Sequence, residues 1–257
     1  AFEISLHESQ ALRRGLVSLV GAGPGNPDLL TLKAFECLQR ADVVYYDNLI
    51  SDEVLDRFRR DTRKVYVGKR RGVEGMKQRV INEMLIRDAQ RGLRVVRLKG
   101  GDPLIFGRGG EELEALKCAD IDFEVVPGIT AALGSAAVAG IPLTHRDSAQ
   151  SVRFITARLS TGDSEIDWAE LVREKQTLVV YMGLAELPIL SQKLVEHGMD
   201  EAMPIAVISK ASYPDQTLVM GTLSDIDERA KSGAVSGPTT IIVGRVVSLG
   251  KALSKDN

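Results

Sequence analysis

The sequence predicts an α/β protein with a mostly parallel sheet covered by helices, and its first half carries the main observation. Short runs of β-branched and apolar residues alternate there with longer segments of helical periodicity, which is the pattern of β-α-β units. The chain is 257 residues long, enough for one large domain or two smaller ones. Apolar residues make up 44% and charged residues 26%, a balance typical of a soluble globular protein rather than a disordered or membrane-embedded one.

The first half divides into alternating strands and helices. The strands are predicted at Leu16–Val20, Val43–Tyr46, Val65–Val67, Arg94–Leu98 and Phe123–Val126. The helices are predicted at Leu29–Arg40, Ser51–Arg59, Lys77–Arg91 and Glu111–Ala119. The helix from Lys77 carries an apolar stripe and stops at Gly92, a residue that suits the C′ position. This alternation predicts parallel strands joined by crossover helices.

A domain boundary is predicted near Pro127, because Val125-Val126-Pro127-Gly128 interrupts the alternation. It gives an N-terminal α/β domain of residues 16–127 and a C-terminal α/β domain of residues 128–250, which opens on the small, apolar segment Ile129–Ala139. Strands of the second domain are predicted at Val152–Thr156, Thr177–Tyr181, Ile205–Ser209, Thr217–Gly221 and Thr239–Val243, and helices at Trp168–Glu174, Ala185–Glu196 and Ser224–Lys231. The third and fourth of these strands lie too close in sequence for a crossover, so we expect a hairpin and a mixed sheet.

Charge balance and the scarcity of metal ligands narrow the function classes. The 33 basic and 35 acidic residues give a net charge of −2, which offers no chain-wide positive field for nucleic acid. The two cysteines and three histidines show no metal-ligand spacing. We therefore expect no metal, no disulfide scaffold and no nucleic-acid partner.

The N-terminal segment resembles an export signal at first sight. Arg13-Arg14 precedes an apolar run, as in a twin-arginine signal, but the run is short and leads into Gly-Pro-Gly-Asn-Pro, which favours a first buried strand. No apolar run approaches the roughly 18–20 residues that a spanning helix needs. The expectation is a cytoplasmic protein with no membrane partner.

Two glycine clusters follow predicted strands. The first, Gly21-Ala-Gly-Pro-Gly25, departs from the dinucleotide fingerprint because Asn26 replaces the third glycine and prolines 24 and 27 lack amide donors; a plain turn and a ligand loop both remain open for it. The second runs from Leu98-Lys-Gly-Gly-Asp-Pro103 to Phe106-Gly-Arg-Gly-Gly-Glu-Glu112. Its excess of glycine favours close approach of the backbone to a ligand.

Charged residues also follow predicted strands. Asp47 and Lys69 come just after Val43–Tyr46 and Val65–Val67. In a parallel sheet they reach the same edge as both glycine clusters, and open α/β sheets bind ligands at that edge. The convergence of these segments predicts a binding site.

A basic run lies between Arg57 and Arg71, where eight Lys/Arg residues accompany one acid, Asp61. It is interpreted either as a solvated helix flank or as a cationic rim for a polyanionic small molecule, since guanidinium groups bind carboxylates bidentately. Arg108 and Arg146 lie in loops defined by glycine and proline, which suits inner carboxylate clamps. Aromatic residues do not interleave with the run, which disfavours nucleic acid.

These segments, in this order, resemble the uroporphyrinogen-III C-methyltransferases of the tetrapyrrole methylase family. The resemblance spans residues 16–250 and is carried by Val20-Gly-Ala-Gly-Pro-Gly25, Leu30-Thr-Leu-Lys33, Ala41-Asp-Val-Val-Tyr-Tyr-Asp47, Val67-Gly-Lys-Arg70, Val96-Arg-Leu-Lys-Gly-Gly-Asp-Pro103, Phe106-Gly-Arg-Gly-Gly-Glu-Glu112, Val126-Pro-Gly-Ile-Thr-Ala131, Ala139-Gly-Ile-Pro-Leu-Thr-His-Arg146, Tyr181-Met-Gly183 and Thr240-Ile-Ile-Val-Gly244. It implies two α/β domains with the active-site cleft between them, usually in a homodimer. The implied reaction uses S-adenosyl-L-methionine to methylate uroporphyrinogen III at C2 and C7, giving precorrin-2 and S-adenosylhomocysteine. That product feeds sirohaem, cobalamin and haem d1 synthesis alike.

The resemblance also implies roles for individual residues. Cofactor contacts fall on Pro24, Gly100, Gly101, Asp102, Ile105, Thr130, Ala131, Met182 and Ala211. The family's acid and base fall on Asp47 and Lys69, and Arg108, Glu111 and Arg146 match positions facing the tetrapyrrole. Relatives commonly read Thr-Gly-His where Thr156-Ala157-Arg158 stands, which puts any role of that histidine in doubt. Our hypothesis is that Asp47 or Glu111 supports proton transfer while Arg108 and Arg146 fix the macrocycle, because arginine is a poor base.

Three alternatives are kept beside this interpretation. One is a methylase of a later corrinoid precursor. A second is a nicotinamide-dependent oxidoreductase built on Gly21–Gly25, against which Asn26 and the prolines speak. A third is a non-catalytic protein that binds anionic tetrapyrroles.

Overall fold

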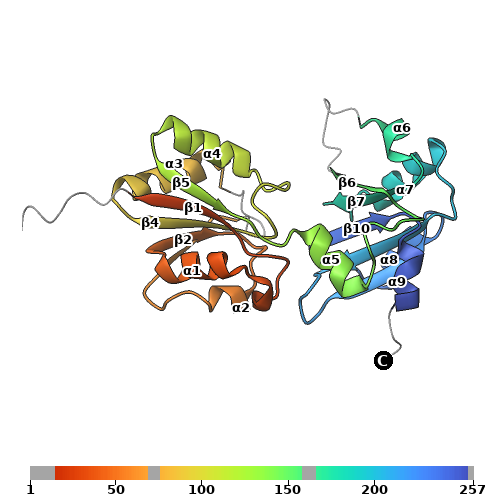
Figure 1. The fold of residues 1–257 in the computed structure, drawn as a ribbon, viewed down its shortest axis with the longest axis horizontal. Helices are drawn as coiled ribbons and strands as arrows, with labels where there is room; N and C mark the ends of the chain where they lie inside the picture. Colours follow the sequence, from red (N-terminus) through yellow and green to blue (C-terminus); the bar gives the residue numbers. More distant parts are fainter. Residues whose placement is uncertain (1–14, 69–75, 158–165, 254–257) are drawn as a thin grey trace, which may run out of the picture. The chain divides into compact units, whose positions relative to one another are not determined.

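The computed structural model describes residues 15–68, 76–157 and 166–253. It divides after Thr130 into two compact units, and each is an α/β layer structure of its own (Figure 1). The domain limits of 16–127 and 128–250 stay a prediction. No helix among the described residues is both long and apolar enough to cross a lipid bilayer.

The first unit is a parallel sheet with helices on both faces. Its strands are β1 (Leu16–Gly21), β2 (Val43–Tyr46), β3 (Arg63–Tyr66), β4 (Arg94–Lys99) and β5 (Asp122–Val126), in the order β3-β2-β4-β1-β5. Its helices are the 3-10 turn η1 (Pro27–Leu29), α1 (Leu32–Arg40), α2 (Asp52–Leu55), α3 (Gln78–Gln90) and α4 (Gly109–Cys118). Each strand pairing in this sheet is parallel, so the predicted topology is confirmed.

Two apolar clusters fix the layers of the first unit. Leu38 of α1 and Val54 of α2 pack on one face of the sheet, and Ile81, Leu85 and Leu116 of α3 and α4 pack on the other. Figure 1 shows the two helix pairs on opposite faces. Burial of these side chains is the main stabilising contribution, and the apolar periodicity predicted from the sequence supplies it.

Local signals set the helix ends. The α1 helix begins at Leu32 rather than Leu29, because the Thr31 side chain accepts a hydrogen bond from the Ala34 amide and caps it. The α3 helix ends before Gly92, whose φ of 79° and bond to the Ala89 carbonyl match the predicted C′ role.

A buried carboxylate ties α3 to the sheet near its amino edge. Asp88 is fully buried, accepts the Tyr45 hydroxyl at 2.6 Å and pairs with Arg63 and Arg87. Burial, and next the hydrogen bond to Asp88, raise the pKa of Tyr45 to about 12. Burial also raises the pKa of Asp88, but Tyr45 and the arginines outweigh it, so the net pKa lies below its ordinary value. We assign the Asp88–Arg63 pair a structural role, since Arg63 and Asp88 lie by the starts of β3 and β4, opposite the strand ends that carry the candidate site.

The second unit contains a mixed sheet, as predicted. Its strands are β6 (Ser151–Thr156), β7 (Gln176–Tyr181), β8 (Pro204–Ser209), β9 (Thr217–Thr222) and β10 (Thr239–Val243), in the order β6-β7-β10-β8-β9. β6 and β7 are parallel, and the other pairs are antiparallel. The predicted hairpin is confirmed as β8–β9, in which Ile208 pairs with Leu218.

The described residues of the second unit form five helices. They are α5 (Ala131–Ala139), α6 (Trp168–Leu171), α7 (Leu187–Glu196), α8 (Ile226–Ser232) and α9 (Val247–Leu253). Of these, α6, α7 and α8 share one apolar core with the sheet. Leu190, Leu194 and Ile226 from α7 and α8 pack on Val180 and Val207 of the sheet. The helix α9 is not among those predicted from the sequence.

Candidate functional site

Glycine-rich loops of the first unit pack against one another at the carboxyl edge of its sheet, where the parallel strands end. Gly23 and Gly101, which follow β1 and β4, exchange two backbone hydrogen bonds with N–O distances of 3.1 and 2.7 Å. Oδ2 of Asp102 accepts a hydrogen bond of 3.1 Å from the Gly128 amide, which follows β5. Pro24 and Gly100 adjoin these contacts in sequence, so these candidate cofactor residues share one edge.

Internal packing explains several of the glycines. A Cβ on Gly128 would lie 2.2 Å from the Gly101 carbonyl oxygen, and one on Gly109 would lie 2.4 Å from the Pro103 carbonyl oxygen. A Cβ on Gly110, by contrast, meets no atom within 4 Å. Loop packing therefore accounts for glycine at 109 and 128 without a ligand. Gly109 belongs to the second glycine cluster, so the inference from glycine excess to ligand approach does not hold at that position.

Adjacent glycines of α4 provide a matched test of this packing. Gly109→Ala should lower the free energy of unfolding by about 1–3 kcal/mol, because backbone must move to admit the methyl group. Gly110→Ala should raise it by about 0.4–1 kcal/mol, because alanine restricts the unfolded chain and meets open space. Urea unfolding of both variants measures whether each free energy of unfolding falls or rises relative to the wild type. A Gly109→Ala variant as stable as the wild type would show that the loop yields without cost.

Asp47 follows β2 and is the predicted site residue with the most defined surroundings. Its Oδ1 accepts the Leu49 amide at 3.0 Å, and its Oδ2 accepts Nη2 of Arg97 at 3.3 Å. Its side chain is 22% exposed, so it faces both this network and solvent. Lys69, the other residue expected after a strand, lies outside the described residues.

Behind Asp47 lies a group of buried charges that is absent from the predicted site residues. Glu112 of α4 is fully buried; its Oε1 accepts Nε of Arg97 at 3.0 Å and its Oε2 accepts Nζ of Lys99 at 3.0 Å. Burial, and next the charge of Arg97, lower the pKa of Lys99 despite the opposing effect of Glu112. The signal in the sequence was the spacing of Arg97, inside the predicted strand Arg94–Leu98, and Lys99, directly after it. The strand β4 extends to Lys99, so the two residues alternate along it and lie on one face.

Arg108 and Glu111 form an exposed pair at the start of α4. The guanidinium donates two hydrogen bonds of 2.7 Å to the Glu111 carboxylate. These bonds lower the pKa of Glu111, which makes it a weaker base. Arg108 has a φ of 59°, a left-handed conformation that is uncommon outside glycine. Its carboxylate-binding fork is thus engaged within the chain, and a substrate carboxylate would have to compete with Glu111.

The basic run divides between the two edges of the sheet. Arg63 begins β3 and pairs with Val43 at the start of β2, which places it at the amino edge, away from Asp47. Arg59 is paired with Asp61, and Lys64 donates to the Leu55 carbonyl. The interpretation of this part of the run as a rim of the site is therefore wrong, and the solvated-flank interpretation holds. Residues 69–71, which follow β3, lie outside the described residues.

Candidate residues of the second unit gather at one edge of its own sheet. β7 and β8 end there, and β10 begins there, since Thr240 pairs with Tyr181 and Thr239 with Ser209. Met182 and Ala211 follow these strand ends. The Tyr181 hydroxyl accepts the Ala132 amide at 3.1 Å, which brings the start of α5, and so Ala131, to the same edge.

The remaining candidates have separate places. Ile105 donates its amide to the Asp102 carbonyl at 3.4 Å within the loop after β4, and Thr130 is buried at the end of the first unit. Arg146 is exposed in the turn closed by His145 and Ala149 of the second unit. No cluster of potential metal ligands occurs among the described residues.

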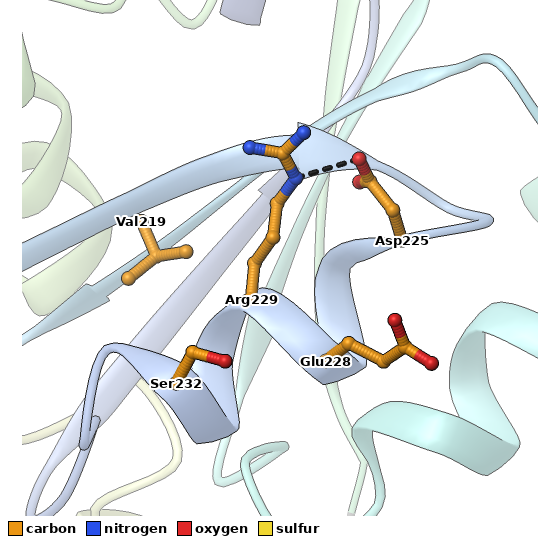
Figure 2. Close-up of a pocket in the computed structure, with 5 residues that line it drawn as sticks. All are labelled: Val219, Asp225, Glu228, Arg229 and Ser232. Atoms are coloured by element: carbon orange, nitrogen blue, oxygen red, sulfur yellow. Dashed lines mark hydrogen bonds and ion pairs between the residues drawn. The ribbon is translucent and has the colours of Figure 1, made fainter.

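A surface pocket of the second unit contains none of the candidates. Figure 2 shows it between β9 and α8, lined by Val219, Asp225, Glu228, Arg229 and Ser232. Arg229 donates to Asp225 at 2.6 Å, and Asp225 also accepts the Thr222 amide at 2.8 Å. These charges are satisfied within the chain, so we assign no ligand to the pocket.

Comparison of this chain with known proteins identifies its family. The model of the Tetrapyrrole (Corrin/Porphyrin) Methylases matches residues 16–227. A sirohaem synthase of Azotobacter vinelandii is 54% identical over 235 residues, which are 91% of this chain and 51% of the relative. The chain thus spans about half the length of such curated relatives.

Solved structures agree with that match. A uroporphyrin-III C-methyltransferase of Thermus thermophilus, complexed with S-adenosylhomocysteine, has a TM-score of 0.78 and 41% identity, covering 91% of this chain and all of the other. A cobalt precorrin-4 methyltransferase of cobalamin biosynthesis has a TM-score of 0.82 and 29% identity, covering 91% of this chain and 96% of the other. The chain belongs to the tetrapyrrole methylase family.

Proposed function

We propose that this chain transfers methyl groups from S-adenosylmethionine to C2 and C7 of uroporphyrinogen III, giving precorrin-2 and S-adenosylhomocysteine. The observation that carries the proposal is the match at 41% identity along the whole T. thermophilus uroporphyrin-III C-methyltransferase, whose structure holds S-adenosylhomocysteine. Because the chain spans about half of the sirohaem synthase relatives, the proposal is restricted to the methylation. The homodimer stays a prediction.

The chain offers suitable groups for the methyl donor. S-adenosylmethionine supplies an electrophilic methyl group on a sulfonium centre. Asp102 has a carboxylate fixed by the Leu104 and Gly128 amides, and Met182 presents a 51% exposed side chain at a strand end. Such fixed polar and exposed apolar groups fit a ligand that combines charge with an adenine ring. The proposed contacts are Pro24, Gly100, Gly101, Asp102, Ile105, Thr130, Ala131, Met182 and Ala211.

The substrate side of the proposal assigns two tasks to side chains. Uroporphyrinogen III carries carboxylates around the macrocycle, and we propose that Arg108 and Arg146 bind some of them as charged forks. When a pyrrole carbon takes the methyl group, the ring system gains positive charge, and loss of one ring-system proton restores neutrality. We propose Asp47 as the acceptor of that proton, since Glu111 is engaged by Arg108. Lys69 is proposed as its acid partner.

A mass measurement tests the function. The chain is incubated anaerobically with uroporphyrinogen III, with or without S-adenosylmethionine, and the product should gain two methyl groups only when the donor is present. Added S-adenosylhomocysteine should slow the reaction by competing for the donor. Macrocycle binding with no methylated product would favour a binding protein, and methylation of a later corrinoid precursor alone would favour the other methylase.

A further inference from the structure

The buried charges behind Asp47 form one connected network. Glu112 accepts hydrogen bonds from Arg97 and Lys99, and Arg97 extends the network to Asp47. The side chains of Arg97 and Lys99 are 5% exposed and that of Glu112 is not exposed, whereas that of Asp47 is 22% exposed. Among these four residues, the network therefore opens to solvent at Asp47.

Arg97 is held from several directions. Besides the bonds to Glu112 and Asp47, its Nη1 donates to the carbonyl oxygens of Tyr45 at 3.3 Å and Leu98 at 2.9 Å. Each nitrogen of the guanidinium therefore has an acceptor, and these acceptors belong to β2, β4 and α4 or to the loop after β2. A guanidinium group fixed in this way donates its Nη2 hydrogen bond to the Asp47 carboxylate from one defined direction.

Asp47 itself is constrained on both oxygens. The Leu49 amide donates to Oδ1 and Arg97 donates to Oδ2, so the carboxylate plane is fixed from its own loop and from β4. Two cations and two anions balance within the network. Buried ion pairs commonly contribute little net stability compared with apolar residues of similar size, so stability alone is a weak reason for this network next to a candidate base.

We propose that Arg97 is a positioning residue that orients the Asp47 carboxylate for proton acceptance, and that Glu112 holds Arg97 in place. This inference rests on the proposed function and deepens it. It assigns Arg97 and Glu112 no contact with substrate. Their effect on the reaction passes through Asp47, and that dependence is what an experiment can separate from a structural role.

A double-mutant cycle tests the dependence. Arg97→Lys keeps the charge but loses the fork, and it should lower kcat about 10- to 100-fold with KM for uroporphyrinogen III changed less than about twofold, since misplacing a catalytic group can cost about that much. In the Asp47→Asn background, the same change should alter kcat by less than about twofold. Glu112→Asp, which keeps the charge and shortens the side chain, should show the same pattern and serves if Arg97→Lys does not fold.

Asp88→Asn is the matched control. Asp88 lies on α3, is as fully buried as Glu112, and pairs with Arg63 of the same sheet. It should leave kcat of the folded protein unchanged. Equal losses from Arg97→Lys in both Asp47 backgrounds would overturn the inference, because they would show that Arg97 does not act through Asp47.

A measurement without turnover separates this inference from the proposed function. Crystal structures of the wild type and of Arg97→Lys should show one Asp47 orientation in the first and a changed or divided one in the second. An identical Asp47 side chain in both would overturn the inference, whatever the activity. Absence of any methylated product from the wild type would overturn the proposed function instead.

Discussion

Replacing Asp47 with asparagine should lower kcat about 10²- to 10⁴-fold while the protein stays folded, because a positioned general base contributes about that much. Asparagine keeps the shape of the side chain, but its single oxygen can accept only one of the two hydrogen bonds that Leu49 and Arg97 donate to different Asp47 oxygens. It cannot take up the ring-system proton. Single-turnover formation of methylated product, measured with saturating S-adenosylmethionine, gives the rate of the chemical step.

A neighbouring carboxylate supplies the control. Asp52 lies in the first turn of α2, a few residues after Asp47, and is exposed. Asp52→Asn should therefore keep the wild-type rate. If Asp47→Asn kept that rate and Glu111→Gln lost it, the base would be Glu111 and the allocation to Asp47 would be wrong.

The chemical environment favours Asp47 over Glu111 as the base. Glu111 shares both of its oxygens with the Arg108 guanidinium, which lowers its pKa and reduces its affinity for a proton. Asp47 has a single arginine contact and one amide contact, and part of its side chain stays accessible. If carboxylates of the bound macrocycle paired with Arg108, Glu111 would lose its partner and could accept a proton. The comparison of Asp47→Asn with Glu111→Gln therefore decides between the two bases.

Local pattern was enough to predict the sheets. The parallel pairing of β1 to β5 follows from strand–helix alternation, and the β8–β9 hairpin follows from a connection too short for a crossover. The same reasoning placed Asp47 and the loop Gly100–Asp102 at one edge. These predictions succeeded because they depend on chain direction and loop length, which a single sequence contains.

The sequence pattern could not predict which of two adjacent identical residues is buried. Glu111 and Glu112 are adjacent in sequence, yet one is exposed with Arg108 and the other is buried between Arg97 and Lys99. The difference follows from the helix starting at Gly109, which turns position 112 towards the sheet. Predicted helix starts are uncertain by a residue or more, and each residue turns a side chain by about 100° around the axis.

The assignment of the basic run failed for another reason. The rim interpretation rested on charge density alone. Arg63 comes just before the predicted parallel strand Val65–Val67, and a residue that precedes such a strand lies at the edge opposite Asp47, as the pairing of Arg63 with Val43 shows. Direction is a property of the topology, so the sequence already contained this correction. The partners of Arg59 and Lys64, by contrast, depend on side-chain placement and required the structure.

Glu112→Gln should lower the free energy of unfolding by about 3–5 kcal/mol, the usual cost of removing one partner from a buried ion pair. Glutamine has nearly the same size, so the loss reflects charge rather than a cavity. Arg97 and Lys99, both 5% exposed, would be left without their shared counter-charge. Urea unfolding at neutral pH measures the difference.

The pH dependence of this deficit has a defined sign. Burial, and next Arg97, already lower the pKa of Lys99, and Glu112 opposes them, so its removal lowers that pKa further. Between the folded pKa and the unfolded value of about 10.4, the unfolded chain binds more protons, and stability rises with pH. The deficit of Glu112→Gln relative to the wild type should therefore shrink from neutral pH towards pH about 10.

Glu111→Gln, which removes an exposed pair, should cost no more than about 1 kcal/mol. Equal losses from the two neighbours would show that burial of Glu112 does not govern its contribution.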